Sequence, residues 1–64
     1  MSGNQSLERG LAILDLLDGA AEPMGIREIA RGMTLSPTIV QRLANTLSQS
    51  GFIVRAPRRL LLKW

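Results

Sequence analysis

The dipeptide Ser36-Pro37 constrains the fold of this chain more than any other feature. Serine is a favoured helix N-cap, and proline is favoured at the first helical position because its missing N–H would have no partner there. The pair predicts a helix over about residues 36–50, ending before Gly51, because glycine commonly follows the last turn of a helix. Four apolar residues at helical spacing predict its inner face: Val40, Leu43, Ala44 and Leu47.

A second, shorter helix is predicted over about residues 26–33, just before this start signal. Gly25 is its expected N-cap, and its apolar residues follow the i, i+3, i+4, i+7 spacing of one helical face: Ile26, Ile29, Ala30 and Met33. Only Met33-Thr34-Leu35 connects the two helices. Two helices with inward apolar faces and so short a connection are typical of a helix-turn-helix.

A further helix is predicted over about residues 6–19, with Ser6 as N-cap and residues 1–5 as a flexible arm. One of its faces, assigned to the core, carries Leu7, Leu11, Leu14 and Leu17. A helix that is apolar on nearly all sides must be buried on two of them, and in so short a chain a second copy is the expected partner. The sequence therefore predicts a homodimer through this helix, with the dimerisation residues Ala12, Ile13, Leu16 and Ala20.

The last part of the chain predicts a β-hairpin over about residues 52–63. Phe52-Ile53-Val54 is short, β-branched and aromatic, residues 56–59 contain a proline turn, and Leu60-Leu61-Leu62 follows as the second strand. The expected fold is mainly α with a small β-hairpin (α+β), a three-helix winged helix-turn-helix over residues 6–64.

The charge of the chain is unevenly distributed. Residues 1–22 carry one arginine and four acids, a net −3, whereas residues 23–64 carry seven cations and one acid, a net +6. Such asymmetry favours a polyanionic partner for the basic part, although a basic patch can also be a merely solvated surface.

The composition argues against several classes of protein. The chain has no Cys and no His, which removes disulfides, the commonest metal ligands and Ser–His or Cys–His catalysis. It also lacks a Gly-rich phosphate loop, so we expect no enzyme, no metal site and no cofactor. No signal peptide is visible, and no apolar run approaches the about 20 residues of a membrane span, so we expect a cytoplasmic protein with no membrane contact.

The outward face of the helix over 36–50 has the composition of a DNA-reading surface. It carries Thr38, Gln41, Arg42, Asn45 and Gln49 and no acid, and the first four lie where they could reach base edges. The major groove is about 12 Å wide and admits one α-helix, where Gln can pair with adenine and Arg with guanine or a phosphate. For Gln41 and Asn45 taken alone, a solvated surface is the simpler interpretation.

Other polar residues are expected to contact the DNA backbone. Ser36 and Pro37, with Thr38, stand at a helix start, where N–H groups and the helix dipole favour a phosphate. Arg27 and Arg31 on the shorter helix are further phosphate candidates. The hairpin adds a basic wing for the backbone or minor groove, Arg55, Arg58 and Arg59, of which the last two could instead only protect a sheet edge.

Three segments resemble the DNA-binding domain of IclR-type bacterial transcription regulators. They are Ser6-Leu7-Glu8-Arg9-Gly10-Leu11-Ala12-Ile13-Leu14, Ile26-Arg27-Glu28-Ile29-Ala30-Arg31 and Leu35-Ser36-Pro37-Thr38-Ile39-Val40-Gln41-Arg42-Leu43, and the similarity continues through Thr46-Leu47 and Ser50-Gly51-Phe52-Ile53. The resemblance implies a winged helix-turn-helix that dimerises through its first helix and reads an operator with its third. It places Arg42 and Gln41 at groove-facing positions and Thr38 at a small hydroxyl position.

The chain departs from that family pattern at three points. Ile39 stands where a hydroxyl residue is usual, and Thr34 stands where the turn usually has glycine. A β-branched residue with positive φ would cost about 1–2 kcal/mol, unless Gly32 takes the bend instead. The larger C-terminal effector domain of the family is absent from these residues, so we expect no small-molecule site.

The residues and the resemblance leave two functions open. The first is sequence-specific binding of double-stranded DNA, as the homodimeric DNA-binding domain of a bacterial transcription regulator. The second is a winged-helix module for protein–protein interaction or dimerisation that does not bind DNA.

Overall fold

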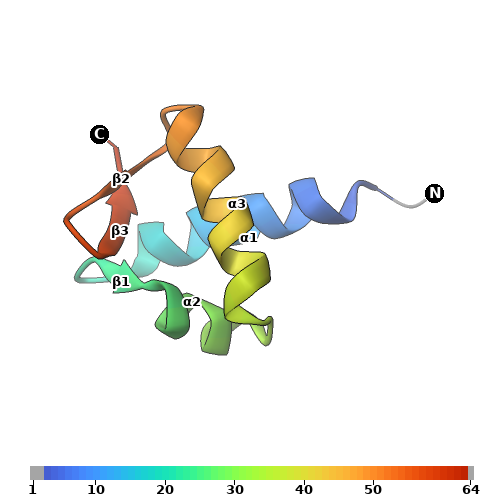
Figure 1. The fold of residues 1–64 in the computed structure, drawn as a ribbon, viewed down its shortest axis with the longest axis horizontal. Helices are drawn as coiled ribbons and strands as arrows, with labels where there is room; N and C mark the ends of the chain where they lie inside the picture. The colour runs from blue at the N-terminus through green and yellow to red at the C-terminus, as the bar shows by residue number, and fades with distance from the viewer. Residues whose placement is uncertain (1–2, 64) are drawn as a thin grey trace.

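The computed structural model describes residues 3–63 and has the α+β winged helix-turn-helix fold expected from the sequence (Figure 1). The helices α1 and α3 cross, with α3 in front in Figure 1, and the small sheet lies at the opposite end of the molecule from the N-terminus. The elements in chain order are α1 (Gln5–Gly19), β1 (Met24–Gly25), α2 (Ile26–Met33), α3 (Pro37–Gln49), β2 (Ile53–Arg55) and β3 (Arg59–Leu62).

The N-cap of α1 is Asn4, so the assignment of Ser6 to this role was wrong. The Asn4 side chain accepts a hydrogen bond from the Leu7 N–H at 3.0 Å, and its backbone carbonyl accepts from the Glu8 N–H at 2.9 Å. Asparagine is as good an N-cap as serine, and capping here extends the helical hydrogen-bond ladder toward the N-terminus. Of the arm expected over residues 1–5, Gln5 is therefore helical, and residues 1–2 lie outside the described part of the chain.

The side of α1 that faces the core agrees only in part with the expected one, because Leu17 is buried and Leu14 packs against the core, but other positions differ. Ile13, expected at a dimer surface, is fully buried, whereas Leu7 and Leu11, expected in the core, are 60% and 56% exposed. The N-terminal turns of α1 extend beyond the other elements in Figure 1, so the core packs mainly on its second half. Because α1 is apolar on nearly all sides, its sequence did not determine which side would be covered.

The other three residues assigned to a dimer surface do not form one apolar face either. Leu16 is half-buried against the core, and Ala20 is the half-buried C-cap of α1, with its N–H bonded to the Leu17 carbonyl. Ala12 is exposed. The available apolar surface of α1 is therefore the side with Leu7 and Leu11.

One core joins the three helices to the sheet. Its largest fully buried side chains are Ile13 from α1, Ile29 from α2, Val40 from α3 and Leu60 from β3. Burial of one such side chain stabilises a fold by about 1.5–3 kcal/mol. The rest of the buried cluster comprises Leu17, Ala30, Ala44 and Ile53.

The sheet has three strands rather than the two of the expected hairpin. Its order is β1-β3-β2 and both pairings are antiparallel, with Met24 opposite Leu60 in one pair and Ile53 opposite Leu62 in the other. An isolated two-stranded hairpin is marginal in water, and β1 gives β3 a partner on its second edge. A strand of two residues has no detectable alternation, so the sequence pattern could not predict β1.

The turn between α2 and α3 places Thr34 in the left-handed region, with φ 57° and ψ 46°. Its N–H donates to the carbonyls of Ala30 and Arg31, and the Leu35 N–H donates to the Ala30 carbonyl at 2.9 Å. Gly32 lies inside α2 and does not take the bend. Left-handed backbone costs a β-branched residue about 1–2 kcal/mol, so the turn stores strain at Thr34.

We predict that Thr34→Gly stabilises the domain by about 0.5–1 kcal/mol. Glycine adopts positive φ without a steric penalty, and this gain exceeds the entropy that its flexible backbone adds to the unfolded chain. Urea unfolding followed by circular dichroism should show a higher transition midpoint with an unchanged slope.

A substitution at Gly51 serves as a control that should change the stability of the domain in the opposite direction. The φ of Gly51 is +85°, and a Cβ placed there would meet no atom within 4 Å, so Gly51→Ala introduces backbone strain without a clash. We expect this substitution to destabilise the domain by about 1–2 kcal/mol. If Thr34→Gly also lowered the midpoint, the strain assigned to Thr34 would be refuted.

Candidate nucleic-acid interface

The outer side of α3 is a polar ridge formed by Thr38, Gln41, Arg42 and Asn45, here called the α3 ridge. Burial of Val40 and Ala44 against the core turns these four residues outward. Three of them are exposed and Gln41 is half-buried. Within residues 3–63, the Arg42 guanidinium makes no ion pair or hydrogen bond, so its charge is available to a ligand.

The start of α3 leaves one backbone donor free. The Ser36 Oγ accepts a hydrogen bond from the Ile39 N–H at 3.3 Å, and Pro37 has no N–H. In the described part of the chain this leaves the Thr38 N–H without a partner, next to the Thr38 hydroxyl. Ser36 and Pro37 therefore shape the helix start, and Thr38 carries the donors for an anion.

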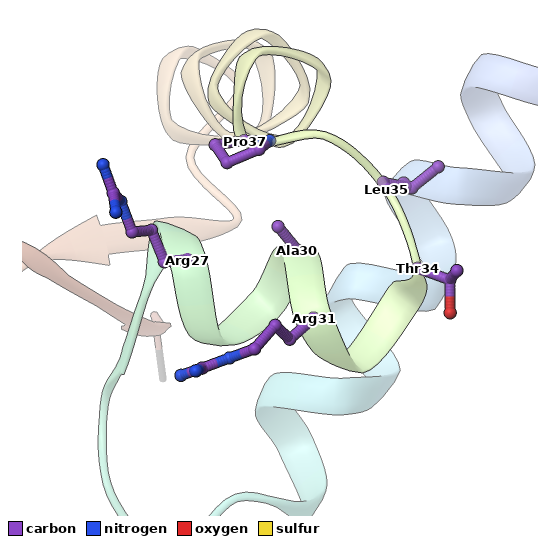
Figure 2. Close-up of a pocket in the computed structure, with 6 residues that line it drawn as sticks. All are labelled: Arg27, Ala30, Arg31, Thr34, Leu35 and Pro37. Carbon is purple, nitrogen blue, oxygen red and sulfur yellow. The ribbon is translucent and has the colours of Figure 1, made fainter.

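Arg27 and Arg31 lie beside this helix start. They line a hollow of about 640 Å³ together with Ala30, Thr34, Leu35 and Pro37. In Figure 2 Arg27 extends upward from the start of α2 and Arg31 extends downward, whereas Ala30 points toward the beginning of α3 and Thr34 points away from the arginines. Two exposed cations thus add to the helix dipole, which also favours an anion at this position.

The wing contributes one arginine directly to the α3 ridge. The Arg55 Nη2 at the end of β2 donates to the Asn45 Oδ1 at 2.5 Å. The same oxygen accepts a hydrogen bond from the Gln41 Nε2 at 3.0 Å. Arg58 lies exposed in the turn between β2 and β3. Its side chain makes no hydrogen bond or ion pair with another described residue.

Arg59 lies apart from the α3 ridge and is paired within the chain, while its expected contact with DNA from the wing stays a prediction. Its Nη1 lies 2.8 Å from the Glu28 Oε1 in an ion pair and donates to the Pro23 carbonyl at 3.2 Å. Arg59 also pairs with Gly25 across the sheet, so its side chain reaches toward β1 and α2. The structure thus gives Arg59 a role in joining the sheet to α2.

Glu28 has a role that was not predicted from the sequence. Its Oε1 accepts a hydrogen bond from the Gly25 N–H at 3.0 Å, which is the acidic half of a capping box at the start of α2. A Glu three residues after a helix N-cap is the signal that would have revealed it. The Gly25 N–H lowers the pKa of the Glu28 carboxyl; partial desolvation opposes this effect, and the charges of Arg59 and Arg31 reinforce it.

An apolar groove lies between α1 and α3 and extends to Phe52, just before β2. Its volume is about 450 Å³, and we call it the α1 groove. Leu7, Leu11 and Phe52 are its most exposed apolar residues. The remaining lining residues are Ser6, Gly10, Leu14, Arg42, Leu43, Thr46 and Leu47.

Within residues 3–63, no helix is both long enough and apolar enough to cross a bilayer.

Comparison with protein families gives a match over most of the chain. Residues 6–57, from the start of α1 to the turn of the wing, match the model of the IclR helix-turn-helix domain. The match covers α1 from its second residue, β1, the helix-turn-helix and β2. A comparison with curated proteins finds no significant match.

We predict that Glu28→Gln makes the free energy of unfolding of the domain change less between pH 7 and pH 2. The pKa of Glu28 is lowered in the folded state, so the charged carboxyl stabilises the fold above its unfolded pKa of about 4.3, and this contribution is lost as the pH falls through the lower folded value. Urea unfolding should show the wild type more stable than the variant at pH 7, with the difference disappearing toward pH 2.

Arg59→Gln provides the control for this experiment. Because the Gly25 N–H is the largest cause of the shift, the loss of stability caused by Glu28→Gln should be smaller in the Arg59→Gln background but should persist there. A loss that stays constant from pH 7 to pH 2 would contradict the role assigned to the Glu28 charge.

Proposed function

The chain belongs to the family of IclR helix-turn-helix domains, and we propose that it binds double-stranded DNA in a sequence-specific manner as the DNA-binding part of a bacterial transcription regulator. The observation that carries this proposal is the α3 ridge, a solvent-facing row of hydrogen-bonding side chains with one unpaired arginine and no acid. Such a regulator would act in the cytoplasm, where bacterial DNA lies.

In the proposed complex, α3 lies in the major groove with the α3 ridge against the base edges. Gln41 and Arg42 carry the base-reading chemistry, because an amide can pair with adenine and a guanidinium with guanine. The Thr38 N–H and hydroxyl contact a phosphate at the helix start, and Arg27 and Arg31, which line the hollow beside it, add positive charge. Arg58 on the wing contacts the backbone or minor groove.

We further propose that the domain binds as a homodimer. Leu7 and Leu11 support a contact through α1, because two leucines more than half exposed are costly to leave in water. The α1 groove would then receive the same surface of a second copy. Two α3 helices in successive major grooves would be about 34 Å apart, which requires a pseudo-palindromic site.

The second candidate function is a protein-interaction module that does not bind DNA. The α1 groove favours it, because an apolar groove can hold another protein's helix. Salt dependence separates the two functions. Several phosphate contacts predict that log affinity for DNA falls with log salt by about 0.9 per phosphate, whereas an interaction module would have negligible DNA affinity at any salt.

We predict that Arg42→Ala weakens binding to a selected site by about 1–3 kcal/mol and relaxes the preference at one base pair. Selection from a random duplex pool would supply the site, and fluorescence anisotropy would measure the affinities. Gln49→Ala, at the end of α3, should leave both quantities unchanged and serves as the control. Unchanged affinity of Arg42→Ala would remove this residue from the interface.

We also predict that Leu11→Glu converts the domain to a monomer and weakens binding to the palindromic site by at least tenfold. A carboxylate at the centre of an apolar interface must be desolvated, whereas in the exposed monomer it costs little. Sedimentation measures the mass, and circular dichroism checks the fold. Ala12→Glu, on the exposed side of α1 away from the groove, should leave the dimer intact; equal dissociation by both variants would contradict the proposed surface.

A further inference from the structure

The Asn45 oxygen on α3 joins the wing to the α3 ridge. It accepts from the Arg55 Nη2 at 2.5 Å and from the Gln41 Nε2 at 3.0 Å. An amide oxygen has two lone pairs, so these two hydrogen bonds use its whole accepting capacity. Asn45 keeps only its amide N–H groups for another partner.

This arrangement gives Asn45 and Gln41 different capacities toward DNA. Paired recognition of adenine requires an amide oxygen for N6 and an amide N–H for N7. Asn45 cannot offer its oxygen to a base without giving up at least one of its present partners. Gln41 uses one N–H on Asn45, and in the described structure its Oε1 and its second N–H remain available.

Arg55 determines which atom donates and which accepts in each of these hydrogen bonds. A guanidinium only donates, so the Asn45 group facing it must be the oxygen. The Gln41 group facing that same oxygen must then be the amide nitrogen, which fixes where the Gln41 Oε1 points. The backbone of Arg55 is itself held in the sheet, opposite the fully buried Leu60.

We propose that Arg55, acting through Asn45, orients the Gln41 amide and so helps to determine which base pair the α3 ridge prefers. Arg55 and Asn45 are thus positioning residues for specificity, and Gln41 is the reader. The inference rests on the proposed DNA-binding function and assigns the wing arginine a task beyond contact with phosphate.

The first test needs no DNA. In the free protein, Arg55→Met should shift the side-chain amide signals of both Asn45 and Gln41 in ¹H–¹⁵N spectra, because the donor that fixes both groups is lost. Arg58→Met removes the same charge from the same wing without a described bond to α3, and should leave these signals in place. A Gln41 signal that does not respond to Arg55→Met would overturn the inference.

The second test measures base preference by selection from a random duplex pool. Arg55→Met and Asn45→Ala should relax the preference at the same base pair as Gln41→Ala, by about fivefold or more. Asn45→Asp keeps an oxygen for both donors and should retain the preference, although its charge lowers overall affinity. In a Gln41→Ala background, Arg55→Met should relax the preference at that base pair no further.

The remaining outcomes separate the inference from the proposed function. If Arg55→Met lowered affinity equally for all sequences and reduced the salt slope by about 0.9, Arg55 would contact only phosphate, and the inference would fall while DNA binding stood. If the wild-type domain enriched no sequence, the proposed function would fall and the inference about base preference with it, even with the hydrogen bonds present in the spectra.

Discussion

The side of α3 that faces solvent depends on the packing of four fully buried side chains. They are Ile13, Ile29, Val40 and Leu60. Each comes from a different element, so the core fixes the rotation of α3 about its own axis. A helix turns once in about 3.6 residues, and burying Val40 and Ala44 therefore directs the α3 ridge to solvent. The same core holds α2 against α3 and the sheet beside both.

The sequence predicted the elements whose signals are local. Ser36-Pro37 marked the start of α3, and the strict spacing of apolar residues in α2 identified its inner face. It did not predict which residues of α1 are covered, because apolar residues lie on most sides of that helix and only the positions of the other elements decide. Hence Ile13 was assigned to a dimer surface, although it is buried, and Leu7 was assigned to the core, although it is exposed.

The candidate site was predicted as a set of residues but not as a set of contacts. Positions on α3 follow from helical periodicity, so the α3 ridge could be read from the sequence. The pairing of Arg59 with Glu28 and of Arg55 with Asn45 joins residues 31 and 10 positions apart, and depends on how β3 and β2 lie against α2 and α3. The three wing arginines look equivalent in sequence, yet one binds an acid, one binds the ridge and one has no side-chain bond to a described residue.

An NMR titration of the ¹⁵N-labelled domain with duplex DNA at low salt tests most directly whether the α3 ridge is the DNA-binding surface. The largest changes in backbone and side-chain amide signals should fall on Thr38, Gln41, Arg42 and Asn45, with smaller changes at the start of α2 and in the wing. Changes confined to Leu7, Leu11 and Phe52 around the α1 groove, with the signals of α3 unmoved, would contradict this assignment.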